Sequence, residues 1–178
     1  MLNKVEFKNK ITEFINGDKQ VVLVKGYVNE FKLLTVLSCL NVSDYKKGTI
    51  HARSIGNLKE ISAQRVVPKK ITQNKNFNIS NLTLQVNLYE QKNIQFGDVA
   101  IYYPVQTAIM FEKDTDKLIN HIKSNSALKI FIITTNDWGF TTEKLEQISD
   151  ELIIFDLKQE DSEKYEILYR NSSGNLPY

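Results

Sequence analysis

A glycine and a lysine six residues apart raise the first chemical question in this sequence. Gly26 and Lys32 have the spacing of the first glycine and the lysine of the phosphate-binding loop G-x-x-x-x-G-K-[S/T]. In that loop, backbone N–H groups surround the phosphates, the lysine contacts them and the hydroxyl residue binds Mg²⁺. Two of the four signature positions match in the segment GYVNEFKL. The spacing therefore predicts a degenerate phosphate site at Gly26 and Lys32.

The two mismatches remove the chemistry of hydrolysis. Phe31 stands where the loop needs its second glycine, and Leu33 stands where a hydroxyl residue would hold Mg²⁺. Phosphoryl transfer depends on the metal and on positioned cations to carry the charge of the transition state. We therefore expect no catalytic residue, no cofactor and a phosphate site filled by the Phe31 ring. The alternative is a regulatory nucleotide site in which Lys32 holds phosphate without Mg²⁺.

An enzyme alternative comes from a second group of charged residues. Glu90 and Lys92 end a β-like segment, and Asp98 follows six residues later. Acids and a lysine are the residue types with which metal-dependent nucleases bind a cation and activate water. Such nucleases place the aspartate before the Glu-x-Lys strand, whereas Asp98 follows it. A turn of ordinary charged residues is the favoured interpretation.

The histidines and the cysteine predict no metal site. His51 and His121 are 70 residues apart, and Cys39 has no second cysteine with which to bind zinc or form a disulfide. Cys39 also lies among apolar residues of a predicted helix. We expect it to be a packed thiol.

Charge is distributed unevenly along the chain. Residues 46–75 carry eight basic side chains and the single acid Glu60, for a net charge of about +7. Residues 141–166 carry nine acids and three lysines, for a net charge of about −6. Two solvated surfaces are one interpretation, and attraction between subunits or to a nucleic-acid backbone is the other. The predicted polyanion-binding residues are Lys46, Lys47, Arg53, Arg65, Lys69 and Lys70.

Aromatic residues gather near the ends of two predicted strands. Tyr102 and Tyr103 end one strand, and Trp138 and Phe140 follow the next. Open α/β sheets place their ligands at this edge, and Tyr and Trp are common anchors of protein interfaces. One interpretation is closure of the core, and the functional one is a protein-docking patch.

The elements that would position these residues alternate along the chain. Apolar spacing predicts helices over 4–16 and 29–40, the latter capped by Asn29, and the apolar run 21–24 predicts a strand buried on both faces. Residues 46–97 are interpreted as a β-rich basic insertion, and 171–178 as a flexible tail. Further strands are predicted at 99–103, 130–133, 152–155 and 165–169, with helices at 116–123 and 141–149. This order predicts one α/β domain with a mainly parallel sheet flanked by helices.

The order of elements over roughly residues 18–170, with the frame from Gly26 to Leu33, resembles the core of RecA-like P-loop NTPases. The resemblance implies a three-layer sandwich. It also implies that a polar residue after the 130–133 strand, Thr135 or Asn136, would sense the terminal phosphate. The acid that organises the metal in that family has no counterpart at the end of the 99–103 strand.

Composition and motifs together lead to a functional hypothesis. No apolar run approaches the roughly 18 residues of a membrane span, and the amino terminus lacks a secretory signal, so we expect a cytoplasmic protein. Its expected role is that of a non-hydrolysing, P-loop-derived accessory protein of a nucleoprotein or ATPase assembly. Protein partners, including a second copy of the chain, are expected, with contact to a nucleic-acid backbone as a further expectation.

Overall fold

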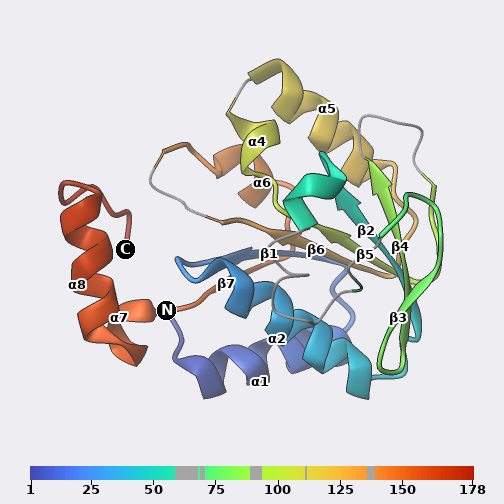
Figure 1. Ribbon diagram of the computed structural model, residues 1–178, viewed down its shortest axis with the longest axis horizontal. Coiled ribbons are helices and arrows are strands. Elements are labelled where there is room, and N and C mark those ends of the chain that lie inside the picture. The colour runs from blue at the N-terminus through green and yellow to red at the C-terminus, as the bar shows by residue number, and fades with distance from the viewer. Residues whose placement is uncertain (59–67, 69–70, 89–93, 111, 136–138) are drawn as a thin grey trace.

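Seven described strands form one sheet in the computed structural model, which describes residues 1–58, 68, 71–88, 94–110, 112–135 and 139–178 (Figure 1). Their order is β3-β4-β2-β5-β6-β1-β7, and all neighbours are parallel except β3 and β4. The predicted α/β fold with a mainly parallel sheet is confirmed. The strands are β1 Val21–Lys25, β2 Lys47–Ala52, β3 Phe77–Ile79, β4 Leu82–Leu88, β5 Val99–Tyr102, β6 Lys129–Ile133 and β7 Glu151–Ile154.

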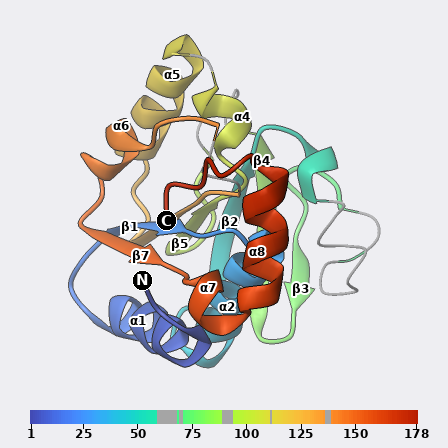
Figure 2. The same ribbon diagram turned by 90° about the vertical axis from the view of Figure 1, so that its left-hand side faces the viewer.

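Helices cover both faces of the sheet. Helices α1 and α2 pack on one face, and α4, α5 and α6 lie on the other (Figure 1). Helices α7 and α8 lie off the carboxyl ends of β1 and β7, near the end of the chain (Figure 2). The helices are α1 Lys4–Asn16, α2 Asn29–Val42, α4 Gln106–Ile109, α5 Glu112–Lys123, α6 Glu143–Glu146, α7 Leu157–Glu160 and α8 Ser162–Asn171, with a 3₁₀ turn at Ile55–Leu58.

Local sequence explains α1. The Asn3 side chain accepts hydrogen bonds from the N–H groups of Val5 and Glu6, and the Glu6 carboxylate accepts one from the Asn3 N–H. This capping box satisfies the free donors of the first turn. The helical spacing of its apolar residues then buries Phe7 and Ile11 against the sheet. The helix predicted over 4–16 is confirmed.

Strand β1 lies between β6 and β7 and is parallel to both. Val22, Leu23 and Val24 are fully buried because helices cover both faces of the sheet at this point. A continuous apolar run is what such a position requires, since neither face meets water. The predicted buried parallel strand is therefore confirmed.

Three sequence-based predictions are corrected by the structure. Residues 165–169 belong to α8, a helix capped by the Asp161 side chain, and do not form a strand. Strands β2 and β4 are integral members of the main sheet, so residues 46–97 are not an insertion beside it. The N-cap of α2 is Val28, which has no capping side chain, and Asn29 is already the first helical residue.

Two smaller findings complete the fold. Cys39 is 2% exposed, its Sγ accepts a hydrogen bond from Thr12 Oγ1 at 3.6 Å, and burial raises the pKa of its thiol. The prediction of a packed thiol is confirmed.

Among the described residues, no helix combines the length and the apolar character that a membrane crossing needs.

Candidate functional site at the carboxyl edge of the sheet

The carboxyl ends of β1 and β6 form the natural place for a site. These strands are neighbours, but the chain leaves β1 for α2 on one face and leaves β6 for α6 on the opposite face (Figure 1). In α/β sheets, ligands commonly bind beside such a change of direction. Gly26 and Thr135 lie at this point, directly beyond the two strands.

The Lys32 side chain lies inside the protein at this point and is fully buried. Its Nζ donates a hydrogen bond to the main-chain oxygen of Gly26 and another, at 3.0 Å, to that of Thr135. The ammonium group thus joins the β1–α2 loop to the end of β6. Gly26 and Lys32 are in contact within the protein, and their assignment as a phosphate site stays a prediction.

Gly26 has a structural reason to be glycine. Its φ is +131°, and a Cβ atom at this position would lie 2.9 Å from both the Cβ and the main-chain oxygen of Phe155. Residues other than glycine rarely adopt this φ, and a contact of that length forces the backbone to shift. Close packing against the end of β7 therefore accounts for Gly26.

We expect Gly26→Ala to lower the free energy of unfolding by about 2 kcal/mol, because it combines an unfavourable φ with a backbone clash. Urea denaturation measures the difference. Gly139→Ala is the matched control, since a Cβ at Gly139 would meet no atom within 4 Å. Equal stability of the two variants would contradict the packing explanation.

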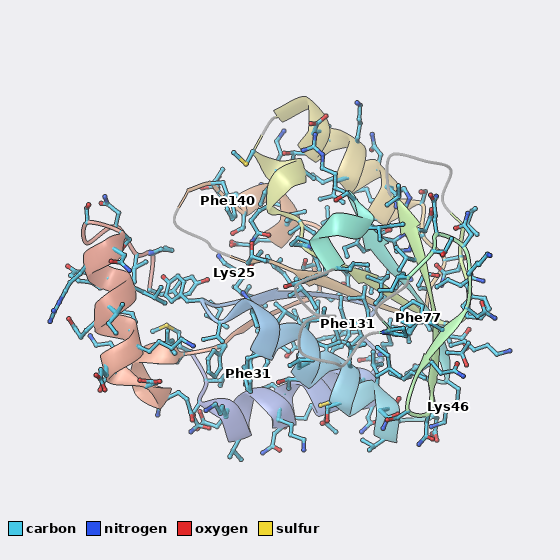
Figure 3. The ribbon with its side chains drawn as sticks, viewed as in Figure 1. Lys25, Phe31, Lys46, Phe77, Phe131 and Phe140 are labelled. Atoms are coloured by element: carbon cyan, nitrogen blue, oxygen red, sulfur yellow. The ribbon has the colours of Figure 1, made fainter. Side chains whose placement is uncertain are left out.

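Phe31 packs away from the loop. Its ring centroid lies 4.6 Å from that of Phe155 and 5.7 Å from that of Phe7, and Lys4 Nζ lies 6.0 Å from its centre. The ring therefore occupies the space between α1 and the end of β7 (Figure 3). The prediction that it fills the phosphate position is wrong. Leu33 is fully buried in the core.

A hydrogen-bonded polar group lies at the carboxyl end of β1, on the α6 side. Lys25 Nζ donates to Thr142 Oγ1 at 2.8 Å and to Glu146 Oε1 at 3.0 Å. The Thr142 hydroxyl also donates to Glu146 Oε1 at 2.7 Å. Hydrogen bonds from Thr142 and then Lys25 lower the pKa of the Glu146 carboxyl. Glu146 therefore stays ionised and holds the Lys25 ammonium in place.

The last residues of the chain place Tyr178 beside the carboxyl end of β1. The rings of Tyr27 and Tyr178 stack with centroids 4.9 Å apart, and Lys25 Nζ lies 5.5 Å from the centre of the Tyr178 ring. The Tyr27 hydroxyl donates to the Tyr178 oxygen at 2.7 Å and accepts from the Tyr178 N–H at 3.1 Å. Tyr178 is thus joined to Tyr27 and Lys25 by hydrogen bonds and ring contacts, while the flexible tail predicted over 171–178 stays a prediction.

A buried polar row crosses the sheet elsewhere. Asn87, His51 and Tyr102 are register partners on β4, β2 and β5, and each is at most 1% exposed. His121 of α5 places its Nδ1 2.8 Å from the Tyr102 hydroxyl, and Asn125, two residues beyond α5, places its amide nitrogen 3.2 Å from His51 Nε2. Sequence analysis missed this row, because only the strand register brings its members together.

Burial controls protonation in this row. It lowers the pKa of His51 to about 3, with a smaller effect from His121, and it lowers the pKa of His121 as well. It raises the pKa of the Tyr102 hydroxyl. Among the described residues, His51 Nδ1 has no hydrogen-bond partner. Both histidines are therefore neutral near pH 7, and the row has no net charge.

Two of the four predicted docking residues, Tyr102 and Tyr103, lie in the core. Tyr102 is fully buried and Tyr103 is 1% exposed, because the two side chains point to opposite faces of a sheet that is covered on both. The prediction that they dock a partner is wrong. Phe140 is half-buried against the α5-side core. Trp138 and the predicted phosphate sensor Asn136 lie outside the described residues.

The structure separates the predicted polyanion-binding residues. Lys46 and Lys47 are exposed at the amino end of β2, on the side of the molecule away from Lys25 (Figure 3). Arg53 lies just past the carboxyl end of the same strand, 3.8 Å from the Asp114 carboxylate. The described members thus form no single basic face. Arg65, Lys69 and Lys70 lie outside the described residues, so this site stays a prediction.

The nuclease alternative also stays a prediction. Asp98 is exposed and lies at the amino end of β5, on the sheet edge opposite the carboxyl ends of β1 and β6. Glu90 and Lys92 lie outside the described residues. In the described part of the chain, no three His, Cys, Asp or Glu side chains are grouped to hold a metal ion.

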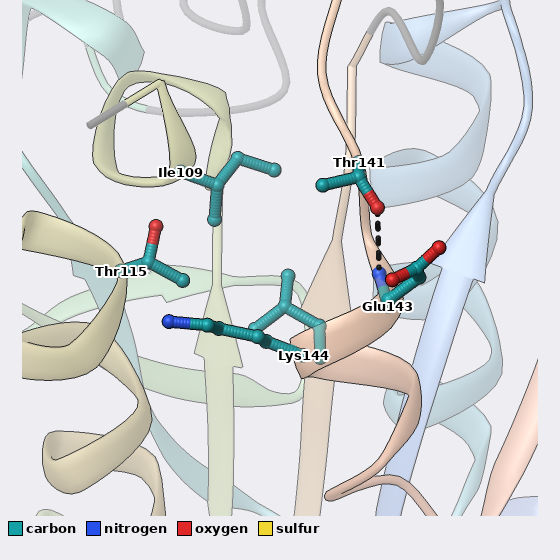
Figure 4. Close-up of a pocket in the computed structure, with 6 residues that line it drawn as sticks. Ile109, Thr115, Thr141, Glu143 and Lys144 are labelled. Atoms are coloured by element: carbon teal, nitrogen blue, oxygen red, sulfur yellow. Dashed lines mark hydrogen bonds between the residues drawn. The ribbon is translucent and has the colours of Figure 1, made fainter. Parts of the chain in front are cut away.

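A pocket of about 260 Å³ opens between α4, α5 and α6 (Figure 4). Its polar groups already have partners within the protein: Lys144 pairs with Asp116 at 2.9 Å, and Thr141 Oγ1 accepts from the Glu143 N–H at 3.3 Å. None of the residues predicted from sequence lines it. The full lining is Ile109, Thr115, Thr141, Glu143, Lys144 and Leu145.

Comparison with known proteins adds one informative likeness. No protein family and no curated protein sequence matches the chain. A crystal structure described as the C-terminal domain of a possible DNA helicase from Lactobacillus plantarum WCFS1 is similar, with a TM-score of 0.54 and 13% sequence identity. The similarity covers 84% of this chain and 97% of that one. At this identity the likeness establishes a shared α/β fold.

Proposed function

We propose that this chain is a RecA-like, P-loop-derived domain that does not hydrolyse nucleotides and serves as an accessory protein of a nucleoprotein or ATPase assembly. The frame from Gly26 to Leu33 follows a buried parallel strand and opens a helix, which is the mechanical context of a phosphate loop. The fold shared with a chain described as a domain of a possible DNA helicase supports the choice of assembly.

The observation that carries the proposal is the burial of Lys32. A phosphate-binding lysine must reach its ligand, but the Lys32 ammonium is inside the protein and donates to the oxygens of Gly26 and Thr135. To reach a phosphate, it would have to leave both carbonyls without this donor, which costs roughly 1–3 kcal/mol for each. Leu33 supplies no metal ligand. The frame therefore offers neither a free lysine for the phosphate nor a ligand for Mg²⁺, the two groups that phosphoryl transfer in such a loop requires.

We expect calorimetric titration with ATP or GTP, with and without Mg²⁺, to give no saturable heat at millimolar nucleotide. Lys32→Met should leave this result unchanged, because the side chain is already committed within the protein. A dissociation constant in the micromolar range that is lost in Lys32→Met would contradict the proposal.

Light scattering with and without double-stranded DNA tests the nucleoprotein role. An unchanged mass in the presence of DNA would leave a protein assembly as the setting of the chain.

A further inference from the structure

Tyr27 and Lys25 together form a site for an aromatic residue. In this structure the site is occupied by Tyr178 of the same chain. Tyr27 is 5% exposed in this arrangement because the Tyr178 ring covers it at a centroid distance of 4.9 Å. Tyr165 of α8 lies on the same tyrosine, with centroids 6.5 Å apart. The residues contributing to the site come from β1, the β1–α2 loop and α8.

The contacts recognise a peptide unit as well as a ring. The Tyr27 hydroxyl uses both its donor and its acceptor capacity on residue 178, one on the main-chain oxygen and one on the N–H. The ring of residue 178 stacks on the Tyr27 ring and lies 5.5 Å from the Lys25 ammonium, as in stacking and cation–π pairs. An aromatic residue in an extended peptide offers the ring, the main-chain oxygen and the N–H that make these four contacts.

The segment that supplies Tyr178 packs on the edge of the core through the half-buried side chains of Leu168 and Leu176. None of the residues of α8 is fully buried, and Ile167 and Tyr169 are 53% and 43% exposed. Withdrawal of residue 178 alone would leave the Leu168 and Leu176 side chains on the core and would uncover the Tyr27 ring.

We propose that this site binds an aromatic residue of an extended peptide from another protein, and that Tyr178 closes it in the free chain by occupying the same contacts. The inference goes beyond the proposed function, because peptide binding here does not depend on whether the β1–α2 loop binds nucleotide.

A nucleobase is the competing ring, and the local charges disfavour it. Lys25, whose ammonium lies over the ring, is already paired with Glu146 at 3.0 Å. A phosphodiester would approach that carboxylate, whose pKa is lowered, so it would meet an ionised group. The uncharged backbone of a peptide meets no such repulsion.

The test uses the peptide NSSGNLPY, the sequence of residues 171–178, with fluorescein on its amino terminus and an amide at its carboxyl end, so that its last residue carries no charge, together with the full chain. Fluorescence anisotropy measures its affinity for the unmodified chain and for Tyr178→Ala and Tyr178→Ser. A tethered competitor acts at an effective concentration near millimolar, so we expect both variants to bind at least about tenfold more tightly than the unmodified chain. Equal affinity, or no saturable binding to either variant, would overturn the proposal.

A second substitution identifies the site. In the Tyr178→Ala chain, Tyr27→Phe keeps the ring and removes the hydroxyl that makes both main-chain hydrogen bonds, and we expect about a tenfold loss of peptide affinity. Tyr45→Phe, on the far side of the molecule, is the control and should leave affinity unchanged. Unchanged binding in Tyr27→Phe would overturn the assignment of the site. Displacement of the peptide by a dT oligonucleotide at equal concentration would overturn the peptide as the ligand class.

Discussion

Replacement of Lys32 by alanine is expected to lower the free energy of unfolding by about 3 kcal/mol, because it leaves a cavity and removes a donor from two main-chain oxygens. For a chain of this length, such a loss corresponds to a fall of about 10 °C in the melting temperature. The same substitution in a functional phosphate loop removes ligand contacts while the fold stays intact. Thermal and urea denaturation of Lys32→Ala therefore distinguish a structural lysine from a ligand-binding one.

Lys117→Ala is the matched control for this experiment. Its side chain is 67% exposed and lies 3.7 Å from the Asp114 carboxylate, a type of surface pair that contributes little to stability. We expect its effect to stay within about 0.5 kcal/mol. If Lys32→Ala were as stable as Lys117→Ala, the ammonium group would not be joining the β1–α2 loop to β6.

Stability should also fall as the pH is lowered from 7.5 to 5.0. Unfolded His51 binds a proton near pH 6.5, whereas in the folded protein burial lowers its pKa to about 3. Between these values the unfolded state holds more protons, so the free energy of unfolding decreases as pH falls. His51 alone is expected to account for about 2 kcal/mol of loss at pH 5.0, and His121 acts in the same direction.

The substitution His51→Phe tests the source of this dependence. It retains a ring that can stack on Tyr102, where the His51 ring now lies at a centroid distance of 4.5 Å, and removes the titrating group. Urea denaturation at pH 7.5 and 5.0 should show a difference about 2 kcal/mol smaller than in the unmodified chain. Glu146, whose pKa is lowered from 4.5, contributes mainly below this range. An unchanged difference would show that His51 is not the source of the pH dependence.

Local apolar spacing was sufficient to predict the first part of the fold. Helix α1 has a clear helical period and strand β1 is a continuous apolar run, and the structure agrees with both predictions. The pattern was ambiguous in α8, where Tyr165, Ile167 and Tyr169 alternate as in a strand. The cap that decides for a helix there is Asp161, which precedes the apolar residues.

The candidate site was less predictable, because its contacts join distant segments. The spacing of Gly26 and Lys32 predicted a phosphate site, whereas in the structure Lys32 donates to the main-chain oxygens of Gly26 and of Thr135, the latter 103 residues away. Tyr178 reaches Tyr27 across 151 residues. Sequence patterns measure local periodicity, and such long-range pairs leave no trace in it.

The position of β1 between β6 and β7 has a consequence for biosynthesis. Residues 21–25 leave the ribosome early, but their two hydrogen-bonding neighbours are residues 129–133 and 151–154. At roughly 5–20 residues per second, the growing chain exposes an unpaired apolar strand for several seconds before its first partner is made. Placement of an early strand between two later ones therefore leaves the apolar residues of β1 without strand partners until residues 129–133 have been made.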